Sequence, residues 1–221
     1  MDKAEEILIG AEKVFERLGY SNTKVQDIAQ ETGYSKVTIY AYYESKANLY
    51  MAVAYKAMQT LIDALYETLN ESKNSTGLEV FMKLSERYID FCVSHLHYME
   101  LLLEYMQIVR RVLSGEKNRT SEEFQNTIFY KKLKNIQNIT MNLVVDEIKK
   151  GQKDGSIKNM ENPWLIHHIM WSMIVGYAKV NYNPSADNFI NTNNQKWREA
   201  LLQILFNMCQ DNFFIEKTEN N

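Results

Sequence analysis

The side chains of this sequence that are best suited to recognition chemistry lie in one passage, GYSKVTIYAYYESKANLY, which runs from Gly33 to Tyr50. It holds five tyrosines around a Ser-Lys pair and has a serine near each end. Hydroxyl and ammonium groups can hydrogen-bond to a polar or anionic partner. Tyrosine rings also pack in protein cores. The composition of the passage does not choose between these two roles, so the elements that position it have to be worked out first.

The sequence shows no arrangement of residues typical of an enzyme or a metal site. It has no nucleophile beside a base, no glycine-rich phosphate loop and no paired carboxylates, so we expect no enzymatic activity and no cofactor. Cys92, His95 and His97 come close to ligand spacing. The two histidines do not share a helix face, however, and no further cysteine or carboxylate completes a set. We therefore expect no bound metal.

The composition predicts an all-α protein. The 221 residues are 45% hydrophobic, which is enough to bury a core, and they include only two prolines and eight glycines. Sheets need frequent turn residues, so this scarcity favours long helices. Two cysteines, no signal peptide and no apolar run long enough to span a bilayer indicate a cytoplasmic protein that does not bind a membrane. The net charge of −3 means that any contact with DNA must come from local geometry.

Apolar residues recur at helical spacing in nine segments. Gly19 and Gly33 are placed to end the first two helices, and Thr23 with Gln26, Ser35, Ser45, Thr76 with Glu79, and Asn162-Pro163 have the chemistry of helix starts. Gly151 is interpreted as the C-cap of the seventh helix. The predicted helices cover approximately residues 7–18, 23–32, 35–42, 45–69, 76–92, 98–113, 120–150, 164–182 and 196–212.

The first three helices have the proportions of a helix-turn-helix unit. The segment TKVQDIAQETGYSKVTIYAYYESKANLY, residues 23–50, resembles the DNA-binding motif of the TetR family of transcriptional regulators. The matching residues, in order and without a gap, are Thr23, Ile28, Ala29, Gly33, Ser35, Lys36, Thr38, Tyr40, Tyr43, Ser45, Lys46 and Leu49. The resemblance implies a DNA-binding domain over residues 1–46 and a ligand-binding and dimerisation domain over residues 47–221.

The resemblance also implies which residues contact DNA. Helix N-termini carry a partial positive charge and free N–H groups that suit phosphate oxygens. The expected contacts are Thr23, Lys24, Ser35, Lys36, Val37, Thr38, Tyr40, Ala41, Tyr42 and Lys46. Lysine suits guanine acceptors, and the methyl groups of Val37 and Thr38 suit the thymine methyl group.

The chain departs from the family pattern at two positions, and its charges are balanced. Val37 stands where the family often has glycine, and Ala41 where it often has a longer polar side chain. Three lysines and three acidic residues between Thr23 and Lys46 predict a shallow dependence of DNA affinity on salt.

The larger part of the chain, from about Ala47, is dense in methionine and aromatic residues. Such residues usually form a plain core, but by resemblance this domain encloses a pocket for a small apolar or aromatic inducer. The candidate ligand contacts are Tyr88, Phe91, His95, Tyr105, Phe129, His168 and Trp171. The last two helices carry more apolar surface than one protomer needs to hide, which predicts a homodimer. The candidate interface residues are Trp164, Ile169, Met173, Ile174, Trp197, Leu201, Leu205 and Met208.

Two functional hypotheses follow from the sequence. The first is a transcriptional repressor that leaves a palindromic DNA operator when its inducer binds. The second, motivated by the neutral motif and by Ala41, is a protein of the same fold that acts through protein partners with weak or no DNA reading. Loss of function on replacing Tyr42 and Lys46 would favour the first.

Overall fold

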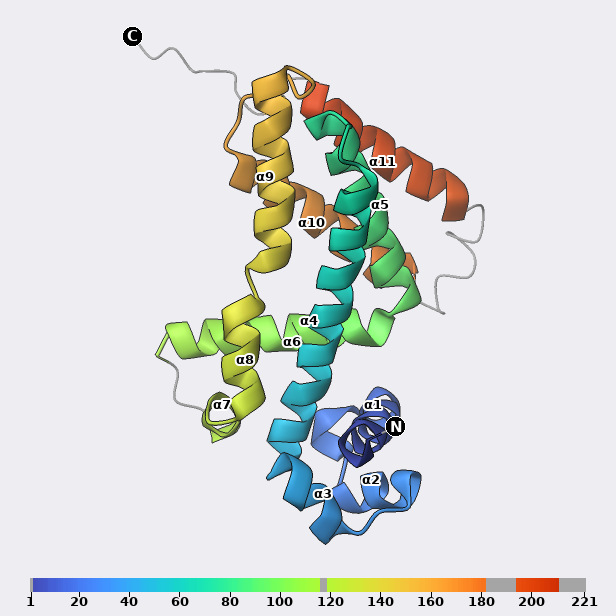
Figure 1. The fold of residues 1–221 in the computed structure, drawn as a ribbon, viewed down its shortest axis with the longest axis vertical. Coiled ribbons are helices and arrows are strands. Elements are labelled where there is room, and N and C mark those ends of the chain that lie inside the picture. The colour runs from blue at the N-terminus through green and yellow to red at the C-terminus, as the bar shows by residue number, and fades with distance from the viewer. Residues whose placement is uncertain (1, 116–118, 182–193, 211–221) are drawn as a thin grey trace. The chain divides into compact units, whose positions relative to one another are not determined.

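A computed structural model describes residues 2–115, 119–181 and 194–210, and over these ranges the chain is helical without strands (Figure 1). The predicted all-α fold is thereby confirmed. The helices are α1 Lys3–Asn22, α2 Val25–Thr32, α3 Lys36–Tyr43, α4 Lys46–Glu71, α5 Gly77–Ser94, α6 Leu96–Leu113, α7 Arg119–Gln125, α8 Ile128–Ile136, α9 Ile139–Asp154, α10 Pro163–Asn181 and α11 Asn194–Gln210. The stretch 183–195, between the last two predicted helices, lies mostly outside the described residues.

The single helix expected over residues 120–150 is three helices, α7, α8 and α9. Thr127 begins α8, because its hydroxyl accepts a hydrogen bond from the Tyr130 N–H at 3.2 Å. A second break follows at Gln137 and Asn138. Apolar residues continue at helical spacing across both breaks, so the sequence pattern does not reveal them.

Most of the other predicted helix starts are confirmed. Ser35 accepts a hydrogen bond from the Thr38 N–H at 3.1 Å, and Asn162 accepts one from the Trp164 N–H at 2.9 Å. Thr76 and Glu79 form a reciprocal capping box at the start of α5. These caps satisfy N–H groups that the first turn of a helix cannot pair internally.

The first two predicted glycine breaks are also confirmed. Gly33 ends α2 in a left-handed conformation, with φ of 73°, and Gly19 interrupts the regular geometry of α1, with φ of 69°. The third prediction is wrong, because Gly151 lies inside α9, which continues to Gly155 with φ of 79°.

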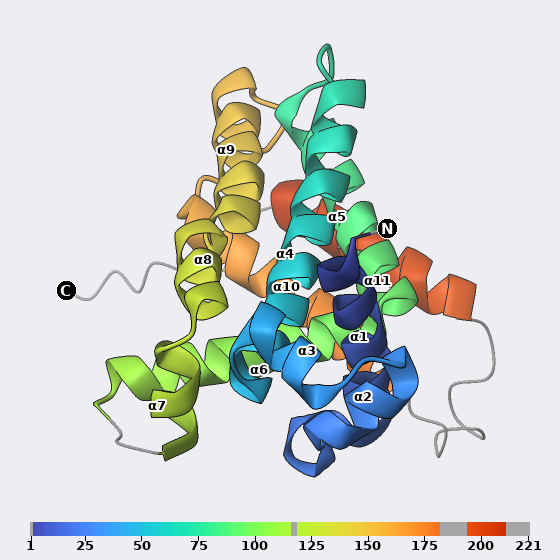
Figure 2. The same cartoon turned by 60° about the horizontal axis from the view of Figure 1, so that its bottom comes forward.

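The chain divides into two compact units. Unit 1 consists of residues 1–60 and 97–137, and unit 2 of residues 61–96 and 138–221, so α4 contributes to both. In unit 1, α1 packs against α2 and α2 against α3, an arrangement that Figure 2 shows from the side of these helices. The compact unit that contains the three N-terminal helices therefore also includes α6 to α8 and the beginning of α4.

Unit 2 is organised around α5, which packs against α9, α10 and α11. The start of α5 touches the end of α9 so closely that a Cβ atom at Gly77 would lie 2.1 Å from the backbone nitrogen of Gly151. This approach explains why position 77 is a glycine. A Cβ atom at Gly151, which does not cap a helix, would lie 2.6 Å from the Ile157 side chain. No helix in the described ranges is long and apolar enough to cross a membrane.

Candidate nucleic-acid interface

The three N-terminal helices are held together by a shared apolar core and by tyrosine hydrogen bonds. Ile39 and Tyr43 are the buried side chains of α3. The Tyr43 hydroxyl donates to the carbonyl oxygen of Ala4 at 2.8 Å, and the Tyr34 hydroxyl donates to the carboxylate of Glu6. This hydrogen bond raises the pKa of Tyr34, and burial raises the pKa of Tyr43. Both tyrosines therefore position the helices rather than face a partner.

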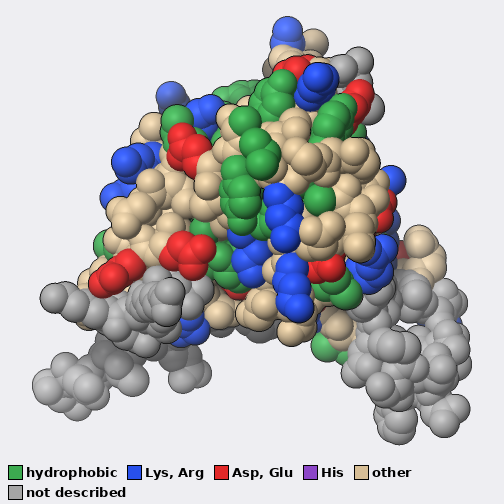
Figure 3. Space-filling model, turned by 90° about the horizontal axis from the view of Figure 1, so that it is seen from below, with side chains coloured by type: hydrophobic (Ala, Val, Ile, Leu, Met, Phe, Trp, Pro, Cys, Tyr) green, Lys and Arg blue, Asp and Glu red, His purple; other side chains and the backbone are tan. Residues whose placement is uncertain are grey.

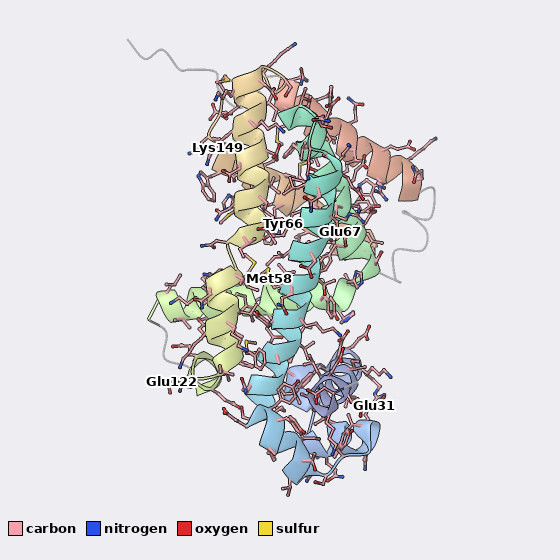
Figure 4. All side chains as sticks on the ribbon, in the orientation of Figure 1. Glu31, Met58, Tyr66, Glu67, Glu122 and Lys149 are labelled. Atoms are coloured by element: carbon pink, nitrogen blue, oxygen red, sulfur yellow. The ribbon has the colours of Figure 1, made fainter. Side chains whose placement is uncertain are left out.

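Glu31 on α2, labelled in Figure 4, pairs with two cations of α1. Its carboxylate lies 3.9 Å from Lys13 Nζ and 3.8 Å from an Arg17 nitrogen. Such exposed pairs contribute little to stability, but they neutralise both cations locally. Lys24, the N-cap of α2, and Lys36 of α3 are therefore the more available positive charges for an anionic partner.

The side of α3 that faces away from the buried Ile39 and Tyr43 is exposed and forms a continuous surface. Val37 is 79% exposed, Tyr40 and Tyr42 are each 44% exposed, and Lys36 and Ala41 are exposed too. Thr38 is half-buried, and its hydroxyl lies 2.9 Å from the Ser35 hydroxyl. Figure 3, a view from below, shows hydrophobic side chains beside Lys and Arg side chains. Helix α3 can therefore present apolar groups, hydroxyls and a cation together to a groove.

The start of α2 differs from the sequence-based expectation. Thr23 is 2% exposed, and its hydroxyl donates to the carbonyl oxygen of Gly19 at 2.7 Å, so this side chain is engaged within the protein. The N-cap is instead Lys24, whose N–H donates to the Asp27 carboxylate at 2.7 Å. Lys24 is exposed and is the cation at this helix start.

Lys46 has a structural role that its place in the motif does not reveal. Its ammonium donates to the carbonyl oxygens of Tyr20 at 2.8 Å and Thr23 at 2.9 Å, and it lies 4.1 Å from the centre of the Tyr20 ring. A cation at the carbonyl end of a helix is electrostatically favourable. Lys46 therefore fastens the start of α4 to the end of α1, and a contact from it to phosphate would compete with these two acceptors.

The residues expected to contact a ligand divide between the two units. Tyr105 and Phe129 belong to unit 1, and the Tyr105 hydroxyl donates to Gln137 Oε1 at 2.8 Å. The other five belong to unit 2. Of these, Tyr88 and Phe91 are buried, His95 and Trp171 are half-buried, and His168 is exposed.

The buried histidine of α10 is His167, the neighbour of the residue chosen from the sequence. His167 is 5% exposed, and neither of its ring nitrogens has a hydrogen-bond partner among the described residues. Burial, together with the adjacent His168, lowers its pKa from the ordinary value of 6.5 to about 4. Sequence reasoning missed it because adjacent histidines on an apolar helix differ only in the direction in which they point.

Half of the residues expected at the dimer interface belong to the core of their own protomer. These are Ile174, Leu201, Leu205 and Met208, none of which is more than 5% exposed. Trp164 is exposed, and Ile169, Met173 and Trp197 are half-buried. Three exposed apolar side chains of α10 and α11 were not selected as interface residues from the sequence: Leu165, Ile204 and Phe206.

Comparison with known proteins agrees with this geometry. The profile of bacterial regulatory proteins of the tetR family matches residues 7–53. The HTH-type transcriptional activator FasR of Mycolicibacterium smegmatis is 22% identical over 128 residues. That match covers 58% of this chain and 58% of FasR, so the chain spans less than two thirds of that relative.

Two solved structures share the fold over almost the whole chain. FadR from Bacillus subtilis, in complex with stearoyl-CoA, has a TM-score of 0.65 and 15% identity over 95% of this chain and 99% of its own. A tetR-family regulatory protein from Rhodococcus RHA1 has a TM-score of 0.70 and 14% identity over 95% of this chain and 98% of its own. Residues 7–53 therefore carry the pattern of the bacterial regulatory proteins of the tetR family, which confirms the resemblance in the helix-turn-helix motif, and the described chain shares its fold with solved proteins of that kind.

Proposed function

We propose that this regulator binds a palindromic operator as a homodimer and releases it when an apolar small molecule binds. The observation that carries the proposal is the exposed face of α3, on which Lys36, Val37 and Tyr40 stand free of the core while Ile39 and Tyr43 anchor the helix. A helix held from one side and exposed on the other fits the major groove of DNA. Such a regulator acts in the cytoplasm, on the bacterial chromosome.

Two helix starts supply the contacts to the DNA backbone in this proposal. The N-terminal ends of α2 and α3 carry a partial positive charge, and each has an exposed lysine, Lys24 and Lys36. Tyr42 adds an exposed hydroxyl. Because Lys46 is bonded within the protein, few phosphates are neutralised by each protomer, and affinity falls only gradually as salt rises.

The proposed inducer has a long apolar part and a polar group. The support from a neighbour of the same fold is the stearoyl-CoA bound by the Bacillus subtilis FadR. In this chain, unit 2 holds His167 inside an apolar core, and neither ring nitrogen has a hydrogen-bond partner within residues 2–115, 119–181 and 194–210. An unpaired buried polar group is costly, so a ligand that hydrogen-bonds to it gains affinity. His167 thus joins the earlier candidates as a ligand contact.

The proposed dimer interface uses α10 and α11. Large apolar side chains on both helices are exposed in the protomer, including Trp164, Ile204 and Phe206. A two-helix surface that pairs with its own copy forms a four-helix bundle with two-fold symmetry. Two reading helices related by that symmetry meet half-sites about one DNA turn apart, roughly 34–36 Å.

The DNA-binding part is tested by fluorescence anisotropy with duplexes from the region upstream of the gene. We expect saturable binding at low salt that Lys36→Ala and Tyr42→Ala each weaken by about tenfold or more, because each removes an exposed backbone contact. Lys149→Ala is the matched control, since Lys149 is an exposed lysine on α9, outside the motif. Absence of binding to any of these duplexes at low salt would contradict the proposal and favour the hypothesis of a protein partner.

The ligand part is tested by adding stearoyl-CoA to the preformed complex with DNA. Release of the operator requires the ligand to bind the DNA-free form better, by a coupling of roughly 1–3 kcal/mol. We therefore expect a 5- to 150-fold weaker DNA affinity at saturation, following that coupling. A ligand that bound the protein and strengthened DNA binding would refute release by this ligand, although operator binding would stand.

A further inference from the structure

The centre of the exposed face of α3 is formed by two small apolar side chains. Val37 and Ala41 lie one helical turn apart, on the side opposite the buried Ile39 and Tyr43. Val37 is the more prominent of the two because it is 79% exposed. An exposed valine contributes little to the stability of its own protomer, so the position is free to serve a partner.

The polar groups around this centre are few. Residues 35–44 contain no asparagine, glutamine or arginine. Asparagine and glutamine are the side chains that pair with adenine through two hydrogen bonds, and arginine is the commonest partner of guanine. The Thr38 hydroxyl is already close to Ser35 Oγ, at 2.9 Å. Lys36 and Tyr40 are left at the edges of the face, so its centre cannot read a base by hydrogen bonds.

One group in the major groove matches an apolar centre. The 5-methyl group of thymine is the apolar feature that distinguishes base pairs there. A valine in a helix holds essentially one rotamer, so its two methyl groups are pre-oriented for such a contact. Ala41, with a single methyl group, allows α3 to approach the bases closely without a side chain in the way.

We propose that Val37 reads the methyl group of a thymine in each operator half-site, with Ala41 providing the room for this approach. This inference rests on the proposed binding of operator DNA and specifies what the operator must contain. An A·T pair is then recognised from its thymine side by apolar contact, in place of the adenine hydrogen bonds that this helix cannot make.

The test replaces thymine by uracil, which removes only the methyl group. The full-length protein is first used to select duplexes from a random-sequence DNA library. Each thymine of the selected sequence is then replaced by uracil, and affinities are measured by fluorescence anisotropy. Removing one buried methyl group is expected to weaken binding by roughly fourfold, and symmetric replacement in both half-sites by roughly 15-fold.

The Val37→Ala variant tests whether the loss of affinity on replacing thymine by uracil is due to Val37. With Val37→Ala, uracil at the one critical position per half-site is expected to cost less than twofold, while other positions behave as with the unchanged protein. Because Val37 is so exposed, the variant is expected to fold. Val93→Ala is the matched control, since Val93 is a 45% exposed valine on α5, and it is expected to keep the full uracil effect.

The possible results separate this inference from the proposed function. If the selected DNA binds but no uracil weakens it, or if uracil weakens Val37→Ala as much as the unchanged protein, the inference is overturned and operator binding stands. If the library yields no enriched sequence, the proposed function fails and the inference fails with it.

Discussion

His167 gives the protein a pH-dependent stability whose size can be worked out from the structure. Its imidazole is buried and has no hydrogen-bond partner in the described part of the chain, and its pKa falls from 6.5 to about 4 on folding. Between these two values the unfolded chain binds a proton that the folded protein excludes. The free energy of unfolding therefore falls as the pH is lowered from about 6.5 towards 4. Above about pH 6.5 the imidazole is neutral in both the folded and the unfolded chain, so the free energy of unfolding is not lowered by its protonation.

The expected loss between pH 7.5 and pH 5.0 is about 2 kcal/mol, from one pKa unit being worth 1.36 kcal/mol. At a pH below both pKa values, the loss in the free energy of unfolding reaches its limit of about 3 kcal/mol by the same relation. The assay is urea unfolding at fixed protein concentration, followed by circular dichroism, at both pH values. His167→Leu, which replaces the imidazole with an apolar side chain of similar size, is expected to remove this part of the pH dependence.

A matched control separates burial from the presence of a histidine. His168→Leu alters the exposed neighbour, and it is expected to keep most of the pH dependence of the unchanged protein. At pH 7.5, His167→Leu is expected to unfold at the same or a higher urea concentration, because it removes two unsatisfied polar atoms from the core. If the His167→Leu variant lost as much stability at pH 5.0 as the unchanged protein, the reasoning would be refuted.

Three other substitutions test the packing and the proposed interface. Gly77→Ala places a methyl group against the backbone of Gly151 and is expected to lower the free energy of unfolding by about 1–3 kcal/mol in thermal melts, so an unchanged melting temperature would contradict the close approach. Lys46→Met removes two charge-assisted hydrogen bonds at the end of α1 and is expected to lower the free energy of unfolding by about 1–3 kcal/mol in urea. Weaker DNA binding with no loss of stability would show instead that Lys46 contacts a DNA phosphate. Ile204→Glu is expected to convert dimers to monomers in size-exclusion chromatography. Ile128→Glu alters an equally exposed isoleucine on α8 and is expected to leave the dimer intact. Dimers that survived Ile204→Glu would place the interface elsewhere.

Local sequence patterns predicted several features whose interaction partners are close in the chain. Ser35 and Thr76 bond to N–H groups three residues away, and Gly33 supplies a left-handed conformation by itself. Such features depend on backbone geometry within one turn, so residue type and spacing predict them. The same spacing, in one uninterrupted register, also identified the resemblance to the helix-turn-helix motif of the TetR family, whose profile matches residues 7–53.

The sequence by itself therefore determined the helical class and the resemblance of the N-terminal helices to the TetR helix-turn-helix motif, because these depend on short-range pattern. The tertiary structure alone decided what individual side chains do. Lys46 finds its acceptors 26 and 23 residues earlier in the chain, and His167 rather than His168 is buried. Leu205 fills the core of its own protomer, while Ile204 beside it is exposed. These outcomes depend on the rotation of each helix about its axis relative to its neighbours. In a helix that is apolar on most sides, the sequence does not indicate which of two adjacent residues faces the core.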